Sequence, residues 1–189
     1  MTRAFDGTEL DEDLLVQLCE EAMRAPTAGH VRGVRAVVLA GRQGVRDYLD
    51  TSCDAEWLAS SSMAPGLAKA GGIVVVVCDP GAYASRYAEA DKAGSGLDLI
   101  EAWPVPYWHG DAAFATMALL LLAEDAGIAA CFMGVFQHDD EILALINAPL
   151  GTLLFGVVFL GHAAAEQERS GSLDRSGPTR SERVARCRF

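Results

Sequence analysis

The sequence has little positive charge and few long apolar runs. Lysine occurs only twice among the 189 residues, at Lys69 and Lys92, and the formal net charge is −11. A general nucleic-acid binder needs clustered cations to neutralise phosphates, so we expect no nucleic-acid partner. The longest apolar run, residues 112–123, is too short to span a bilayer, so we expect no membrane partner.

Paired cysteines and metal-ligand patterns are also missing. Five cysteines are scattered without C-x-x-C spacing, which fits a reducing compartment. The four histidines show no spacing suited to a metal ion, so no metal site is predicted. The N-terminus is polar and acidic, without a signal peptide. We therefore expect a cytoplasmic protein.

Known catalytic motifs are absent as well. The chain has no G-x-S-x-G, no P-loop and no G-x-G-x-x-G after a predicted strand. Cys131 is either a nucleophile or, as we favour, a small core cysteine. His109 and Asp111 form either an acid–base pair or, as we favour, a surface histidine beside a helix cap. An enzyme with so few polar catalytic groups would depend on a bound cofactor.

Hydrophobic patterns predict one α+β domain over residues 1–189. Strands are expected where β-branched residues run between glycines or prolines, at 34–41, 71–80 and 153–162. Helices are expected at 11–25, at 45–52, within 55–70, from Asp111 to Gly127 and at 138–147. The helix after Asp111 is apolar almost all round, which is typical of a core centre or a dimer interface.

Two segments remain outside this pattern. Residues 81–110 are irregular and rich in aromatic side chains, which predicts a segment that covers a site. We expect the shape of this cover to set the choice of substrate, through Tyr83, Tyr87, Trp103, Tyr107 and Trp108. Residues 169–189 carry six arginines against Asp174 and Glu182, a local charge of +4 that leaves about −15 on the rest. This basic tail either contributes to an anion site, docks on an acidic surface or is solvated.

Four segments, taken in order, resemble the nitroreductase family. They are "RAPTAGHVRGVRAVVL", "DAAFATMALLLLAEDAGIAACFMGVF", "VVFLGHA" and "RSGPTRSERVARCRF". The segments "RYAEADKAGSG" and "WPVPYW" look like an actinobacterial-type branch of that family. The resemblance implies a mostly antiparallel sheet flanked by helices in an intertwined homodimer that binds FMN between its subunits. It also implies that hydride passes from NAD(P)H through the flavin to a nitroaromatic, quinone or enone.

The same resemblance implies the residues of the site. Around the flavin ring and sugar it implies the segment Pro26, Thr27, His30 and Arg32, and the backbone of Phe132, Met133 and Gly134. For the phosphate it implies Arg175 and Arg180 of the tail, and for the substrate we name Tyr107 and Trp108.

The chain departs from the family pattern at several positions. Of the family's N-terminal arginine clamp only Arg3 is present, so we expect either that the start of the chain is misplaced or that phosphate binding is weaker. Histidine stands at position 30 for asparagine, and arginine at 32 for glutamine. Arg32 either meets an anionic part of a ligand or is a surface residue, and Arg35 is expected to face solvent. The alternative function is a nitroreductase-fold binding or structural subunit with weakened flavin binding, which holds another ligand or pairs with an active homologue.

Overall fold

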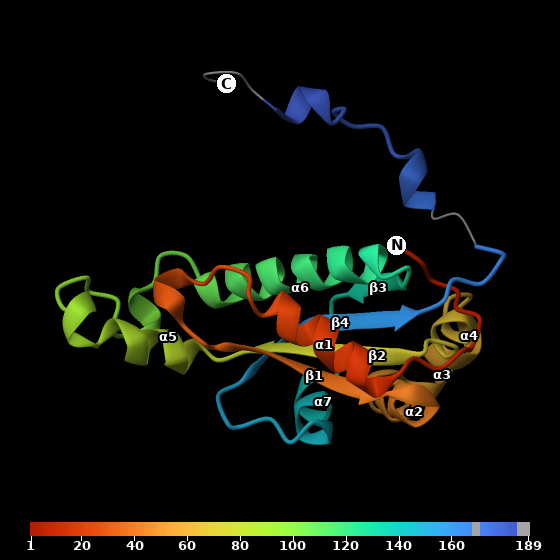
Figure 1. Cartoon of the computed structure of the whole chain (residues 1–189), viewed down its shortest axis with the longest axis horizontal. Coiled ribbons are helices and arrows are strands. Elements are labelled where there is room, and N and C mark those ends of the chain that lie inside the picture. Colours follow the sequence, from red (N-terminus) through yellow and green to blue (C-terminus); the bar gives the residue numbers. More distant parts are fainter. Residues whose placement is uncertain (168–170, 185–189) are drawn as a thin grey trace.

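A four-stranded antiparallel sheet forms the centre of the protein (Figure 1). The computed structural model describes residues 1–167 and 171–184. The strand order is β1-β2-β4-β3, with β1 at Val34–Ala40, β2 at Gly72–Cys78, β3 at Ala129–Met133 and β4 at Leu153–Gly161. The predicted α+β class, with an antiparallel sheet flanked by helices, is confirmed.

Strand β2 is buried along its whole length. It pairs with β1 on one side and β4 on the other, and all seven of its residues are inaccessible to solvent. Successive side chains point to opposite faces of a sheet, so a strand covered on both faces is apolar at every position. This explains the uninterrupted run after Gly71, which the sequence predicted to be a central strand.

Helices cover the two faces of the sheet separately. Val74, Val76 and Cys78 pack under α1 (Glu12–Ala22) and α6 (Tyr107–Asp125). Ile73, Val75 and Val77 face the other side. The helices on that side are α2 (Gly41–Ser52) and α7 (Asp139–Leu145), shown below the sheet in Figure 1, and α3 (Ala55–Ser60) and α4 (Ala64–Leu67), shown at its right-hand end.

The predicted cover contains more regular structure than the sequence indicated. Helix α5 (Pro80–Tyr87) and two short 3-10 turns, Ala90–Lys92 and Ile100–Ala102, form an end of the molecule that projects beyond the sheet (Figure 1). A further 3-10 turn, Ala28–His30, lies between α1 and β1, and two more, Gly171–Asp174 and Ser181–Arg183, lie in the tail.

Two helix starts differ from the prediction. Gly41 was expected to close a strand, but its positive φ of 63° begins α2 instead. Asp111 was expected to cap α6, but the helix already starts at Tyr107, after Pro106. The Asp111 side chain is buried and bonds to groups outside its own helix, so it is not free to cap the helix. The predicted end of α6 is correct: Gly127, with φ of 72°, follows its last turn.

Helix α6 is apolar on its outer face as well as its inner one. Leu119 and Ala123 are buried, yet Phe114, Met117 and Leu121 are 54%, 53% and 59% exposed. Their spacing of three and four residues places them in one stripe along the helix, which we call the α6 stripe. Within the described residues, no helix combines the length and apolarity needed to cross a membrane.

Burial of thiols predicts a loss of stability at alkaline pH. Burial raises the pKa of Cys19, on the inner face of α1, from 9.0 to about 11. Below pH 9 the thiol is protonated in both states; between pH 9 and 11 the unfolded chain loses the proton first. The free energy of unfolding should therefore fall as pH rises through this window. Urea unfolding at several pH values should show a shallower fall for Cys19→Ala, and an unchanged slope would contradict the prediction.

Candidate functional site

The turn between α1 and β1 lines a hollow on the α6 side of the sheet. This hollow, of about 470 Å³, brings together four residues of the predicted cofactor site: Pro26, Thr27, His30 and Arg32. Arg24 and Asp111 also line it. We call it the Thr27 hollow. Its lining includes a threonine, a histidine and two arginines, which suits a polar or anionic part of a ligand. Arg32 is exposed, and Arg24 pairs with Glu21 at 3.2 Å.

A buried carboxyl group holds this turn against two helices. Asp111 of α6 is 2% exposed, and its Oδ2 accepts hydrogen bonds from the Ala28 backbone N–H and the Tyr83 hydroxyl, both at 2.8 Å. Tyr83 belongs to α5 and is fully buried. Burial is the larger cause and the bond to Asp111 the smaller cause of a raised pKa for Tyr83, so its hydroxyl stays protonated and remains a donor. One oxygen thus ties the turn to both α5 and α6.

The sequence interpretation missed this role of Asp111. Neither of the alternatives for His109 and Asp111 describes the structure, because Asp111 bonds to the turn and to Tyr83, while His109 Nδ1 lies 3.9 Å from Cys78 Sγ. The available signal was an acidic residue within an otherwise apolar helix. Such a residue is buried at high cost unless hydrogen-bond donors meet it.

The backbone of the turn is tightly folded. Gly29 and His30 both have positive φ, 63° and 59°, and the His30 N–H donates to Thr27 O at 3.1 Å. The left-handed conformation is unfavourable for a residue with a side chain. The conformation of His30 turns the chain directly before β1 begins at Val34.

A second hollow lies on the opposite face of the sheet. It measures about 370 Å³ and contains two more predicted residues, Met133 and Gly134. We call it the Met133 hollow. Its lining is largely apolar and aromatic and includes Tyr48, Trp57, Phe136 and Phe159. A Cβ at position 134 would lie 2.9 Å from the Phe136 ring, so glycine lets that ring approach the backbone. Such walls suit a flat apolar ring.

The remaining residues near β3 are divided between the two faces. Phe132 packs on the α6 side, stacked on Phe155 with ring centroids 5.7 Å apart. Cys131 is 1% exposed, and burial raises the pKa of its thiol despite the opposing effect of Arg3, which supports a core cysteine.

Arg3 is half-buried in the N-terminal segment, where Phe5 N–H donates to Gly66 O of α4.

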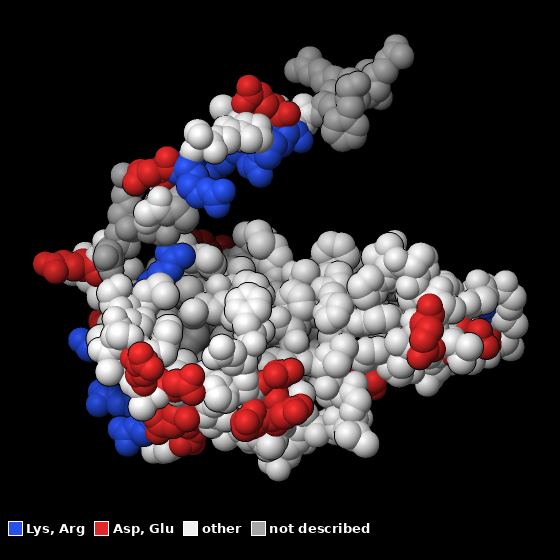
Figure 2. All heavy atoms as spheres, turned by 180° about the vertical axis from the view of Figure 1, so that it is seen from behind, with Lys and Arg blue, Asp and Glu red and all other residues white. Residues whose placement is uncertain are grey.

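The basic tail stands away from the body. Figure 1 shows residues 171–184 above α6, and Figure 2 shows an open space and a largely uncharged surface beneath them. Arg175 and Arg180 are exposed. Three further arginines of the predicted tail, Arg169, Arg186 and Arg188, lie outside the described residues.

The five aromatic residues of the predicted cover pack on one another. Trp103 is the centre: its ring contacts those of Tyr83, Tyr87, Tyr107 and Trp108 at centroid distances between 4.7 and 6.1 Å. Of the two residues predicted to meet the substrate, Tyr107 is 46% exposed, whereas Trp108 is 7% exposed. Only Tyr107 therefore presents much of its surface to solvent.

One protomer does not unite the predicted site. The Thr27 hollow lies under α6, and the Met133 hollow lies beyond the sheet among α2, α3 and α4. Because β2 and β4 fill the space between them with buried side chains, the two groups of residues cannot contact one ligand within a single copy.

Comparison with known proteins identifies relatives over most of the chain. The model of the nitroreductase family matches residues 1–162. A protein of Archaeoglobus fulgidus, named provisionally as an NADH dehydrogenase/NAD(P)H nitroreductase, is 23% identical over 181 residues, which cover 94% of this chain and 88% of that protein.

Solved structures share the fold. An FMN-dependent nitroreductase from Clostridium difficile R20291 has a TM-score of 0.65 at 15% identity, covering 100% of this chain and 94% of that one. The gut-bacterial enone reductase CLA-ER has a TM-score of 0.66 at 18% identity, covering 92% and 89%. The α+β sheet described above is thus the nitroreductase-like fold that the sequence predicted.

The bond between Tyr83 and Asp111 can be tested by removing one hydroxyl. We expect Tyr83→Phe to lower the free energy of unfolding by about 2 kcal/mol, because a bond to a buried carboxyl oxygen is lost. Tyr107→Phe, at an exposed tyrosine of the same cluster, should change it by no more than about 0.5 kcal/mol. Urea unfolding measures both; equal effects would contradict this role for Tyr83.

Proposed function

The chain belongs to the nitroreductase family, and we propose that it is an FMN-dependent oxidoreductase that takes hydride from NAD(P)H and passes it to a small electron-poor substrate. The names of the relatives support this class of reaction. The observation that carries the proposal is the Thr27 hollow, where four residues expected around a flavin line one space. The substrate class we propose is a nitroaromatic, quinone or enone.

The residues present fit FMN, which joins a flat apolar ring to an anionic chain. Thr27, His30 and Arg32 supply hydrogen-bond donors and positive charge in one hollow, and Met133 and Gly134 supply an apolar wall in the other. We assign the phosphate to Arg3, Arg175 and Arg180, because guanidinium groups form paired hydrogen bonds with phosphate oxygens. When bound, FMN supplies the hydride-carrying chemistry that these side chains lack.

The chain's own contribution is to bind, orient and shield. The turn positions Thr27 and His30, the apolar and aromatic lining of the Met133 hollow would pack against the ring, and backbone N–H groups near Gly134 would stabilise negative charge on a reduced ring. The exposed Tyr107 lies at the start of α6, where we place contact with the substrate.

We propose that two copies build each site in an intertwined homodimer. The two hollows lie on opposite faces of one protomer, so a ligand that touches both sets of residues needs a second copy. The α6 stripe supplies an apolar surface for that contact, and the tail extends from the body in a position to reach a partner (Figure 1). We place this dimer in the cytoplasm.

The first test is flavin binding. We expect protein purified without added flavin to bind FMN on titration, with flavin absorption bands that bleach on addition of NAD(P)H. Arg32→Gln should weaken FMN binding about tenfold or more, because it removes a charged hydrogen-bond donor from the Thr27 hollow. The matched control is Arg35→Gln, three residues along the chain at an exposed position of β1.

Two results would contradict this proposal. A protein that stays colourless and gives a flat FMN titration would favour the alternative of a binding or structural subunit, above all if a second chain co-purifies with it. Equal affinities for Arg32→Gln and Arg35→Gln would assign Arg32 to the solvated surface.

The dimer is tested at the α6 stripe. Met117→Glu places a charge on an apolar surface that we expect to be buried between subunits, so sedimentation velocity should show a shift from dimer to monomer. Leu150→Glu, at a fully exposed loop position, should leave the dimer intact. A wild-type monomer, or a dimer that tolerates glutamate at 117, would contradict the proposed interface.

A further inference from the structure

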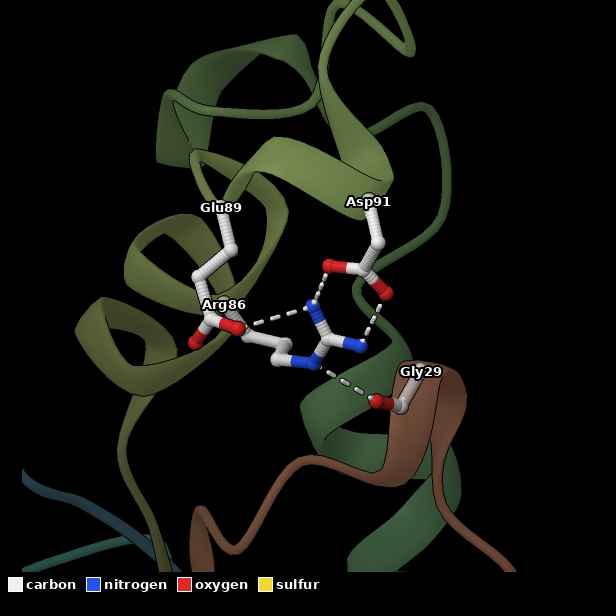
Figure 3. Close-up of polar contacts among 4 residues, drawn as sticks. All are labelled: Gly29, Arg86, Glu89 and Asp91. Atoms are coloured by element: carbon white, nitrogen blue, oxygen red, sulfur yellow. Dashed lines mark hydrogen bonds and ion pairs between the residues drawn. The ribbon is translucent and has the colours of Figure 1, made fainter.

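Arg86 connects the cover segment to the turn of the Thr27 hollow (Figure 3). It lies on α5, and its Nε donates to the carbonyl oxygen of Gly29 at 3.1 Å, across 57 residues of sequence. Its Nη1 and Nη2 form a fork with the two carboxylate oxygens of Asp91, each at 2.7 Å, and Nη1 also meets Glu89 at 3.1 Å. One guanidinium group therefore holds three elements together.

The geometry of these bonds limits how Arg86 can move. Its side chain is only 23% exposed, whereas Glu89 and Asp91 are 61% and 60% exposed. A paired fork fixes the plane of the guanidinium group, and this plane directs Nε at Gly29. Hydrogen bonding to Arg86 keeps the pKa of Asp91 below its usual value, so the carboxylate is charged at neutral pH.

A second contact from α5 acts on the same glycine. A Cβ at position 29 would lie 2.7 Å from the Tyr87 ring, so the ring rests directly on the Gly29 backbone. Tyr87 in turn packs against Trp103 at a centroid distance of 4.7 Å. The turn is therefore fixed by Asp111 at Ala28 and by Arg86 and Tyr87 at Gly29. The side chains of Thr27 and His30, on either side of Gly29, line the hollow.

We propose that Arg86, set by Asp91, is a positioning residue that holds the turn of the Thr27 hollow in its ligand-binding conformation and couples it to the cover. The effect on FMN binding rests on the proposed function. The effect on the turn itself does not. A change at Asp91 would reach Thr27 and His30 through the Arg86 side chain, which bonds both Asp91 and Gly29.

The test measures the turn and the ligand separately. In flavin-free protein, amide hydrogen exchange at Ala28, His30 and Val31 should quicken roughly tenfold in Arg86→Lys, because a lysine cannot make the fork and the Gly29 bond together. Asp91→Asn should produce a smaller change in the same direction, and the double variant should match Arg86→Lys alone. In Arg86→Lys the Kd for FMN should rise about tenfold, and in Asp91→Asn it should rise less.

The matched control is Arg42→Lys. Arg42 also bonds a backbone carbonyl, that of Gly7, and meets a carboxylate, Glu9, but it lies at the start of α2. It should leave exchange at the turn and the Kd for FMN at their wild-type values. Exchange in β2 should stay slow in every variant, which separates a local effect from global unfolding.

Each outcome decides one claim. Unchanged exchange at the turn in Arg86→Lys would overturn the positioning role, whatever FMN does. Faster exchange with an unchanged Kd for FMN would overturn the link to the ligand. If wild-type protein binds no FMN, the proposed function fails, while the exchange data still decide whether Arg86 holds the turn.

Discussion

The Asp111 carboxyl group is the interaction on which the Thr27 hollow depends. A single oxygen accepts from the Ala28 N–H and the Tyr83 hydroxyl, and it does so in the interior, where an unpaired polar group is costly. Helix α6 therefore determines where the turn lies, and α5 is fixed by the same atom. Arg86 and Tyr87 add contacts at the next residue, Gly29, so the turn is held by the cover as well as by the core.

The sheet separates the groups that a flavin would need. Side chains alternate along β2, so one strand supports two cores, one under α1 and α6 and the other under α2 and α7. The two hollows lie on these opposite sides. A protomer built in this way has an incomplete site, and the exposed α6 stripe is the surface through which we propose that a second copy completes it.

Much of the fold could be predicted from the sequence. The continuous apolar run before Cys78 indicated a central strand, and the all-round apolar helix before Gly127 indicated a core or interface helix. The helix start at Tyr107 was missed, because an aromatic, proline-flanked segment carries no cap signal. The residues expected at the Thr27 turn line one hollow, and their roles toward FMN stay predictions.

The sequence by itself determined three of the four strands, the main helices and the resemblance to the nitroreductase family, because hydrophobic periodicity and short motifs are local properties of the chain. Strand β3 was missed, because its five residues include no β-branched run. Only the tertiary structure decided what Asp111 and Arg86 do, since their partners Ala28 and Gly29 are 83 and 57 residues away. It also decided that Thr27 and Met133 face different sides of the sheet, because that depends on strand order and pairing, which no local pattern encodes.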